Sequence, residues 1–137
     1  MYRNKKNSNL YISRNADGGC ALCALHQFEI LEESNHTAIV KNNYPYDVWE
    51  GMDVIEHLMI LPKEHAAALS DVSPATLQNI IQLIVKYESL GYNVYARTRE
   101  SKLRSISHHQ HTHLLKVAGK PAKALLYVQK PYLLLKI

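Results

Sequence analysis

The sequence predicts a domain of the α+β class, in which one main helix packs on a mostly antiparallel sheet. One stretch in the middle of the chain, residues 74–90, repeats apolar residues at helical spacing. The other regular stretches are short, strand-like runs between turn residues, and most follow one another without an intervening helix. Consecutive strands with short connections pair antiparallel, so we expect a meander with a single helix inserted.

The composition is that of one globular domain. The chain has 137 residues, of which 47% are apolar and 20% charged, so it can bury a core of its own. No apolar run approaches the roughly 20 residues of a membrane span, and no apolar segment follows the basic start MYRNKKNSN as in a signal peptide. We therefore expect a single cytoplasmic domain over residues 1–137, without membrane contact. The net charge of +4 favours an anionic partner but does not choose between a nucleotide, a nucleic acid and no such partner at all.

Turn residues and apolar runs predict the structure of the segments outside the helix. Residues 1–18 are polar and lack periodicity, which indicates a loose N-terminal arm. Residues 20–27 are expected to form a short helix or a knuckle-like turn. Residues 42–53 hold Pro45, Gly51 and three aromatic side chains, and we expect a loop suited to binding.

Strands are expected wherever short apolar or alternating runs lie between such turns. The five expected in the main sheet are residues 28–32, 37–41, 55–61, 92–98 and 109–117. Two more runs, 124–129 and 132–137, predict a C-terminal β extension within residues 118–137.

The helix has clear boundary signals. Ser73 is a favourable N-cap, Pro74 suits the first turn, and Gly91 can end the helix. Its apolar stripe is expected to face the core and consists of Leu77, Ile80, Ile81, Ile84 and Val85.

Histidines are concentrated in one run. Four of the eight histidines lie between His108 and His113. On a strand, alternate side chains share a face, so His109, His111 and His113 would form one row. Imidazole can act there as a nucleophile or as a metal ligand. A solvated polar strand face explains this strict alternation less well.

The two cysteines, Cys20 and Cys23, form a C-x-x-C pair. In a cytosolic chain such a pair is more often a metal or redox site than a disulfide. The redox interpretation requires a thioredoxin-like βαβ pattern, which the sequence lacks. A zinc site requires two further ligands, which the histidines can supply. The remaining alternative is two small apolar residues in a turn.

Four segments together resemble the histidine triad superfamily. The hallmark His-x-His-x-His, followed by two apolar residues, corresponds to residues 109–115. Residues 57–65, HLMILPKEH, resemble the family's strand ending in Pro-Lys-x-His, and residues 91–95 and 42–45 resemble its preceding strand and its ribose-contacting turn. The order agrees from about residue 20 to residue 117. The sequence departs from the family pattern at Gln110 and Thr112, in a longer loop after Pro45, and in a basic segment at 99–104.

The resemblance implies a nucleotide-binding hydrolase or nucleotidyltransferase. Such a protein acts at the α-phosphate of a nucleoside phosphate or dinucleoside polyphosphate through a nucleotidyl-histidine intermediate. By position, His111 would be the nucleophile, and His113 and His57 would flank the phosphate and assist the leaving group. Asn42 would contact the ribose. Cationic and hydroxyl side chains would suit the phosphate, and the candidates are Arg97, Arg104, Ser105 and Ser107.

The resemblance also implies a structural zinc ion and a homodimer. Some branches, and the related galactose-1-phosphate uridylyltransferases, carry a C-x-x-C pair that holds zinc with two histidines. By position, the ligands here are Cys20, Cys23, His65 and His109, with His57 as the alternative to His65. Four protein ligands make such a site structural. Family members commonly pair through the helix and an edge strand, so a homodimer is expected.

Two other functions remain open from the sequence. A metal-dependent hydrolase or dioxygenase would use the triple-histidine face as direct ligands and would need an open coordination position. A non-catalytic nucleotide- or RNA-binding module would use the basic loop and the aromatic residues, but it has no need of three aligned imidazoles. Metal content separates the first of these from the nucleotide enzyme.

Overall fold

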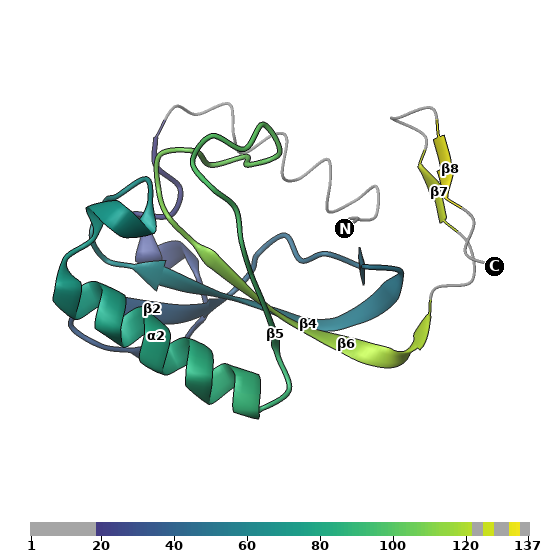
Figure 1. Ribbon diagram of the computed structural model, residues 1–137, viewed down its shortest axis with the longest axis horizontal. Coiled ribbons are helices and arrows are strands. Elements are labelled where there is room, and N and C mark those ends of the chain that lie inside the picture. The colour runs from purple at the N-terminus through teal and green to yellow at the C-terminus, as the bar shows by residue number, and fades with distance from the viewer. Residues whose placement is uncertain (1–18, 122–124, 128–131, 135–137) are drawn as a thin grey trace.

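The computed structural model describes residues 19–121, 125–127 and 132–134 (Figure 1). Its main sheet has the strand order β1-β2-β4-β6-β5, and β3 pairs with β4 at the side of this path. All its pairs are antiparallel. The strands are β1 (Ile30–Glu33), β2 (Thr37–Lys41), β3 (Val48–Trp49), β4 (Met52–Pro62), β5 (Asn93–Ala96) and β6 (Thr112–Pro121). With helix α2 (Pro74–Ser89) as the main helix, the α+β fold class is confirmed.

The part of the chain that the structure describes also contains two short 3₁₀ helices and a small second sheet. Residues Leu25–Gln27 form the 3₁₀ helix η2, and Leu69–Asp71 form η3 before α2. Strands β7 (Leu125–Tyr127) and β8 (Tyr132–Leu134) pair with each other in a separate two-stranded sheet. They fall within the runs predicted at 124–129 and 132–137. The predicted arm over 1–18 lies outside the described residues, as do the ends of those two runs.

Helix α2 packs on one face of the sheet, and the segment after residue 19 packs on the other. The helix side buries Ile39, Leu58, Ile60 and Leu114 against Ile80, Leu83 and Tyr87. The opposite side buries Ala38, Val40, Met59 and Leu61 against Leu22. Because side chains alternate along a strand, the odd-numbered residues of β4 and β6, His57 and His113 among them, face away from the helix.

The helix begins as predicted but buries a different stripe. Ser73 is the N-cap, and its Oγ accepts the Thr76 N–H at 3.3 Å. The residues that α2 buries are Thr76, Ile80, Leu83 and Tyr87. The prediction that the whole apolar stripe is core is therefore wrong for Leu77, Ile81 and Val85, which are exposed. Apolar residues extend around more of the helix than the sheet can cover.

The bounds of β1, β4, β5 and β6 also differ from prediction, most of all at the starts of β4 and β6 and at the end of β6. The expected loop at 42–53 contains a tight hairpin, in which Glu50 (φ 50°) and Gly51 (φ 76°) join β3 to β4, so β4 begins at Met52 rather than residue 55. Strand β6 begins at Thr112, not at residue 109, and continues to Pro121. Before β6, the Gln110 N–H donates to the Ala66 carbonyl at 2.6 Å, outside the sheet ladder.

Among the residues that the structure describes, no helix is both long and apolar enough to cross a lipid bilayer.

Candidate functional site

Two cysteines and two histidines converge beside the end of β4. The ligand atoms of Cys20, Cys23, His65 and His109 all lie within 4.8 Å of one another. Cys20 Sγ and Cys23 Sγ are each 3.4 Å from His109 Nδ1, and Cys23 Sγ is 3.0 Å from His65 Nδ1. These are the four residues that the resemblance implies as ligands. His57, the alternative to His65, lies elsewhere, bonded to His113.

Local structure presents each of these atoms. The Cys23 N–H donates to the Cys20 carbonyl at 3.1 Å, and this turn brings both thiols to one side. His65 follows the end of β4, and His109 precedes β6, the strand paired with β4. His109 is fully buried, and its Nε2 lies 3.0 Å from the Pro62 carbonyl. A carbonyl only accepts, so Nε2 carries the proton and Nδ1 presents its lone pair to the thiols.

The donor set fits zinc. A tetrahedral zinc ion, with sulfur at about 2.3 Å and nitrogen at about 2.0 Å, separates those two ligand atoms by about 3.5 Å. The two distances from cysteine sulfur to His109 Nδ1 are close to that value. Partial desolvation of its sulfur, followed by the neighbouring Cys20 thiol, raises the pKa of Cys23 to about 11. A bound divalent cation would favour both thiolates.

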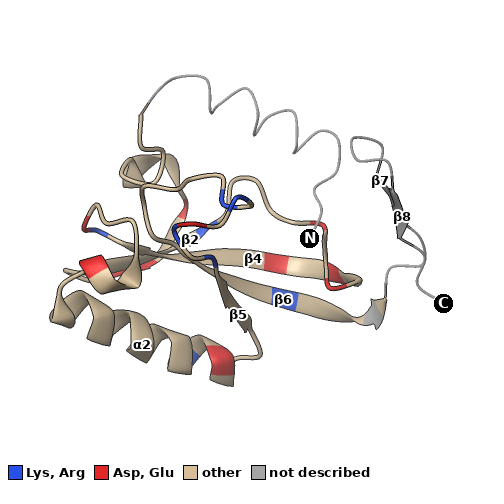
Figure 2. Cartoon of the chain, turned by 45° about the horizontal axis from the view of Figure 1, so that its top comes forward, with Lys and Arg blue, Asp and Glu red and all other residues tan. Residues whose placement is uncertain are grey.

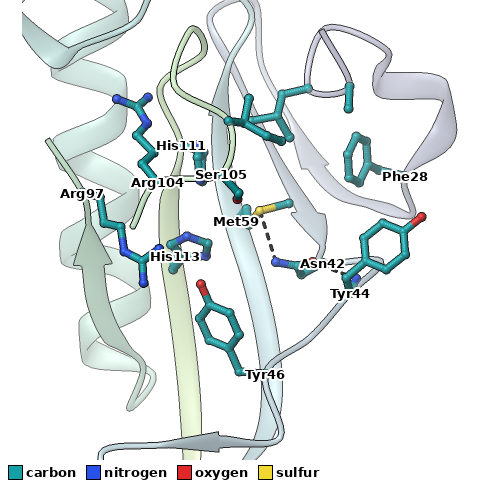
Figure 3. Close-up of a pocket in the computed structure, with 13 residues that line it drawn as sticks. Phe28, Asn42, Tyr44, Tyr46, Met59, Arg97, Arg104, Ser105, His111 and His113 are labelled. Atoms are coloured by element: carbon teal, nitrogen blue, oxygen red, sulfur yellow. Dashed lines mark hydrogen bonds between the residues drawn. The ribbon is translucent and has the colours of Figure 1, made fainter. Parts of the chain in front are cut away.

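A pocket lies on the sheet face away from α2 (Figure 3). Its apolar wall comes mostly from the N-terminal segment and from the loop before β6, and includes Leu22, Phe28, Met59 and Ile106. Its polar and aromatic lining consists of Asn42, Tyr44, Tyr46, Arg97, Arg104, Ser105, His111 and His113. An apolar wall that faces a row of polar groups suits a ligand with a flat apolar part and a charged part.

His57 and His113 form a hydrogen-bonded pair in this pocket region. In the β4–β6 register Met59 is opposite His113, so His57 is its diagonal neighbour. The Tyr46 N–H donates to His57 Nδ1 at 3.0 Å, and His57 Nε2 lies 2.8 Å from His113 Nδ1. The backbone donor fixes the neutral His57 as the Nε2–H tautomer. His113 therefore accepts at Nδ1, and its neutral form carries its proton on Nε2.

His111 is held the opposite way round from His109. Its Nδ1 lies 3.0 Å from the His109 carbonyl, so Nδ1 donates and the lone pair is on Nε2. Burial, with smaller contributions from nearby cations, lowers the pKa of His111 to about 4. Its ring lies edge-on to that of His113, with centroids 4.9 Å apart. The structure thus brings His111 and His113 to one pocket and His109 to the cysteine cluster.

Of the five predicted substrate contacts, four line the pocket and one does not. Asn42 lines it and is oriented by the Tyr44 N–H, which donates to Oδ1 at 2.8 Å. Arg97, Arg104 and Ser105 also line it, and the Arg97 guanidinium points toward His113 (Figure 3). Ser107 is exposed and is not among the lining residues. The structure therefore does not bring Ser107 to the predicted site.

Two aromatic residues complete the surroundings of His113. Tyr46 packs on His57 and His113, with ring centroids 4.4 and 5.5 Å away. Tyr95 is opposite His113 in the β5–β6 register and stacks on it at 5.6 Å and 27°. Tyr46 belongs to the aromatic loop singled out in the sequence. Tyr95 was missed, because its strand carried no signal beyond alternation.

Comparisons with known proteins identify the fold. No protein-family model matches the sequence, and no curated protein matches it significantly. Among solved structures, a HIT family hydrolase from Clostridium thermocellum matches with a TM-score of 0.56 at 21% identity, over 79% of this chain and 98% of that one. A histidine triad nucleotide-binding protein from Candida albicans matches with a TM-score of 0.54 at 21% identity, over 81% and 89% of the chains. A zinc-bound histidine triad family protein from Mycobacterium smegmatis matches with a TM-score of 0.57 at 16% identity, over 74% of this chain and 76% of that one. At these identities the matches show the fold alone, and they confirm the predicted fold class.

Proposed function

We propose that the chain is a nucleotide hydrolase or nucleotidyltransferase that acts at the α-phosphate of a nucleoside phosphate or dinucleoside polyphosphate. The observation that carries this proposal is the tautomer of His111. Its Nδ1 donates to the His109 carbonyl at 3.0 Å, so the Nε2 lone pair is available in a pocket that also holds His113 and Arg97. An imidazole fixed in this way is an activated nucleophile for phosphorus.

The reaction has two steps. His111 Nε2 attacks the α-phosphorus and forms the P–N bond as the bond from phosphorus to the leaving group breaks. The leaving atom accepts a hydrogen bond from His113 Nε2–H and takes up a proton from solvent as it departs. Water, or another acceptor in a transferase, then attacks the same phosphorus, releases its proton to solvent and returns the electron pair to His111 Nε2. The hydrogen bond from His57 Nε2 to His113 Nδ1 at 2.8 Å strengthens the Nε2–H group of His113 as a donor.

The pocket lining supports a nucleoside substrate. The apolar side chains of Leu22, Phe28 and Ile106 suit the flat base, and Asn42 suits a ribose hydroxyl. Arg97 and Ser105 suit the phosphate, whose spread negative charge is stabilised by preorganised donors.

We propose that Cys20, Cys23, His65 and His109 hold a structural zinc ion. All four ligands come from the protein, so the ion would stabilise the fold and leave no position for substrate. The ion would fix His109, whose carbonyl orients His111. We propose a cytoplasmic location for the chain, because a reducing environment keeps both cysteines available as metal ligands.

We also propose a homodimer formed through α2 and the edge strand β5. Leu77, Ile81 and Val85 recur every fourth residue on one exposed stripe of the helix, and α2 carries few charges (Figure 2). Val94 on β5 is also exposed. Such an apolar face on an otherwise ordinary domain is typical of an interface between copies.

The metal-dependent hydrolase is less well supported. Within the described part of the chain, the one group of three or more potential ligands is the cysteine cluster. His111 Nδ1 is engaged by a backbone carbonyl and His113 Nδ1 by His57, so the three triad imidazoles do not converge on one point. No observation favours a non-catalytic RNA-binding module over the nucleotide enzyme.

The test is incubation with nucleoside phosphoramidates, dinucleoside polyphosphates and nucleotide sugars, followed by product analysis. The expected product contains a nucleoside monophosphate or its transferred group, and rapid quenching should trap a nucleotidyl adduct that maps to His111 by mass spectrometry. An adduct on another residue, or no turnover of any substrate in the panel, would refute the proposal.

A further inference from the structure

Arg104 is a buried cation whose hydrogen-bond acceptors are all neutral. It is 7% exposed. Its Nη1 donates to the Ala67 carbonyl at 2.7 Å, and its Nη2 donates to the His109 carbonyl at 2.8 Å and to Gln110 Oε1 at 3.4 Å. With the residues that the structure describes it forms no ion pair, and Glu100 attracts it only at longer range. Because burying a charge without a hydrogen-bonded counter-charge is costly, the carbonyls that hold this guanidinium indicate a specific role for it.

The partners of Arg104 connect the two halves of the site. Ala67 lies two residues after His65, and the His109 carbonyl is the acceptor for His111 Nδ1 at 3.0 Å. That carbonyl oxygen therefore accepts two hydrogen bonds, one from Arg104 Nη2 and one from His111 Nδ1. One guanidinium thus ties the segment after β4 to the backbone group that orients His111.

The direction of the side chain separates Arg104 from Arg97. In Figure 3 the Arg97 guanidinium points toward His113, whereas the Arg104 guanidinium turns away from His113 and Asn42. Both arginines line the pocket, but the polar end of Arg104 is engaged by backbone carbonyls. Arg97 also donates to protein groups, from Nε to Tyr95 Oη and from Nη1 to the Leu103 carbonyl, but its guanidinium lies on the His113 side of the pocket. Arg104 is oriented to hold the backbone.

We propose that Arg104 is a positioning residue for His111, acting through the shared carbonyl of His109. This inference rests on the proposed role of His111 as the nucleophile. The rigid fork of arginine reaches two carbonyls at once in fixed geometry, which a lysine ammonium cannot reproduce. With the carbonyl held, His111 keeps its proton on Nδ1 and its Nε2 lone pair toward the substrate.

The kinetic test compares Arg104→Gln and Arg104→Lys with wild type, with Lys102→Gln as the control for an exposed cation in the same loop. A displaced reacting group costs up to about 100-fold in rate. We expect Arg104→Gln to lower kcat by about 30- to 100-fold with KM nearly unchanged, Arg104→Lys to lower it less, and Lys102→Gln to behave as wild type. A large rise in KM with kcat preserved would mean direct substrate contact and overturn the inference, as would unchanged kcat in both Arg104 variants.

A second measurement does not depend on nucleotide turnover. Long-range ¹H–¹⁵N correlation spectra report which ring nitrogen of His111 carries the proton. We expect the Nδ1–H tautomer in wild type and a mixture with the Nε2–H tautomer in Arg104→Gln, with zinc content and melting temperature recorded for both. If Arg104→Gln does not fold, Arg104→Lys serves for the same comparison.

The two measurements distinguish the two failures. If wild type turns over no nucleotide, the proposed function fails, and the tautomer comparison still tests Arg104. If wild type is active but His111 has the same tautomer with and without Arg104, the positioning role is wrong and the proposed function stands.

Discussion

His109 and His111 are two residues apart, yet the backbone holds them by opposite ring nitrogens. For His109 the Pro62 carbonyl engages Nε2, so Nδ1 points to the cysteine cluster. For His111 the His109 carbonyl engages Nδ1, so Nε2 is left for the pocket. One residue type thus presents its lone pair to the cysteine cluster, which is the proposed metal site, at position 109 and to the pocket, which is the proposed reactive site, at position 111. The difference is the acceptor that the fold supplies to each ring, because the hydrogen bond at one nitrogen fixes the chemistry of the other.

The largest expected effect is a loss of turnover at the pocket that holds His111, with no change at the cysteine cluster. His111→Asn removes the attacking nitrogen, and we expect turnover to fall by on the order of 10⁴-fold or more. Nucleotide affinity, measured calorimetrically with a non-hydrolysable analogue, and zinc content should stay near wild type, because the cluster does not use this ring. Loss of zinc together with activity would instead support the metal-dependent hydrolase.

His113→Asn should have a smaller effect on the same site. It removes the hydrogen-bond donor to the leaving group rather than the bond-forming atom, and one preorganised donor contributes about 10²- to 10³-fold. We expect a slower reaction with an ordinary leaving group and a smaller loss with a leaving group of low pKa, such as a nitrophenolate. Equal losses for both leaving groups would contradict the assigned hydrogen bond.

Removing a ligand from the cysteine cluster should lower the stability of the fold more directly than it lowers activity. We expect Cys20→Ser and Cys23→Ser to release zinc and to lower the melting temperature by roughly 10 °C, since metal binding contributes directly to folding. Activity should fall by about 10- to 100-fold, as the outer support of His111 loosens. Elemental analysis of protein purified without chelator checks this, and wild type without stoichiometric zinc would show the site assignment to be wrong.

The smallest effect on either site should come from the exposed helix stripe. Ile81 is 51% exposed and Val85 60%. We expect Ile81→Asp to convert a dimer to a monomer in light scattering at high concentration, while zinc content and the His111 adduct persist. Gln78→Asp, at an exposed polar position of the same helix, is the matched control. A wild type that is monomeric at high concentration would refute the dimer.

Local signals predicted the parts of the fold that depend on local structure. The bounds of β2 and the Ser73 N-cap agree with prediction, because alternation and capping act over a few residues. The β3–β4 hairpin was missed because Glu50 adopts a positive φ that its residue type does not favour. The exposure of Leu77, Ile81 and Val85 was missed because an apolar helical pattern does not tell which part of the apolar surface a sheet covers.

For the candidate site, the sequence by itself determined which residues are available and what chemistry they could perform. Histidine spacing and the C-x-x-C pair predicted a nucleophile and a metal cluster before any contact was known. The family resemblance implied that His109 joins the cysteines and that His111 faces the nucleotide, but only the tertiary structure decided which ring nitrogen each of them presents. The Pro62 carbonyl that engages His109 is 47 residues away and the thiols are 86 and 89 residues away, and Arg104, expected as a phosphate contact, donates to backbone carbonyls. A ring's tautomer depends on the acceptor beside it, and strand pairing and loop closure across the whole chain bring that acceptor there.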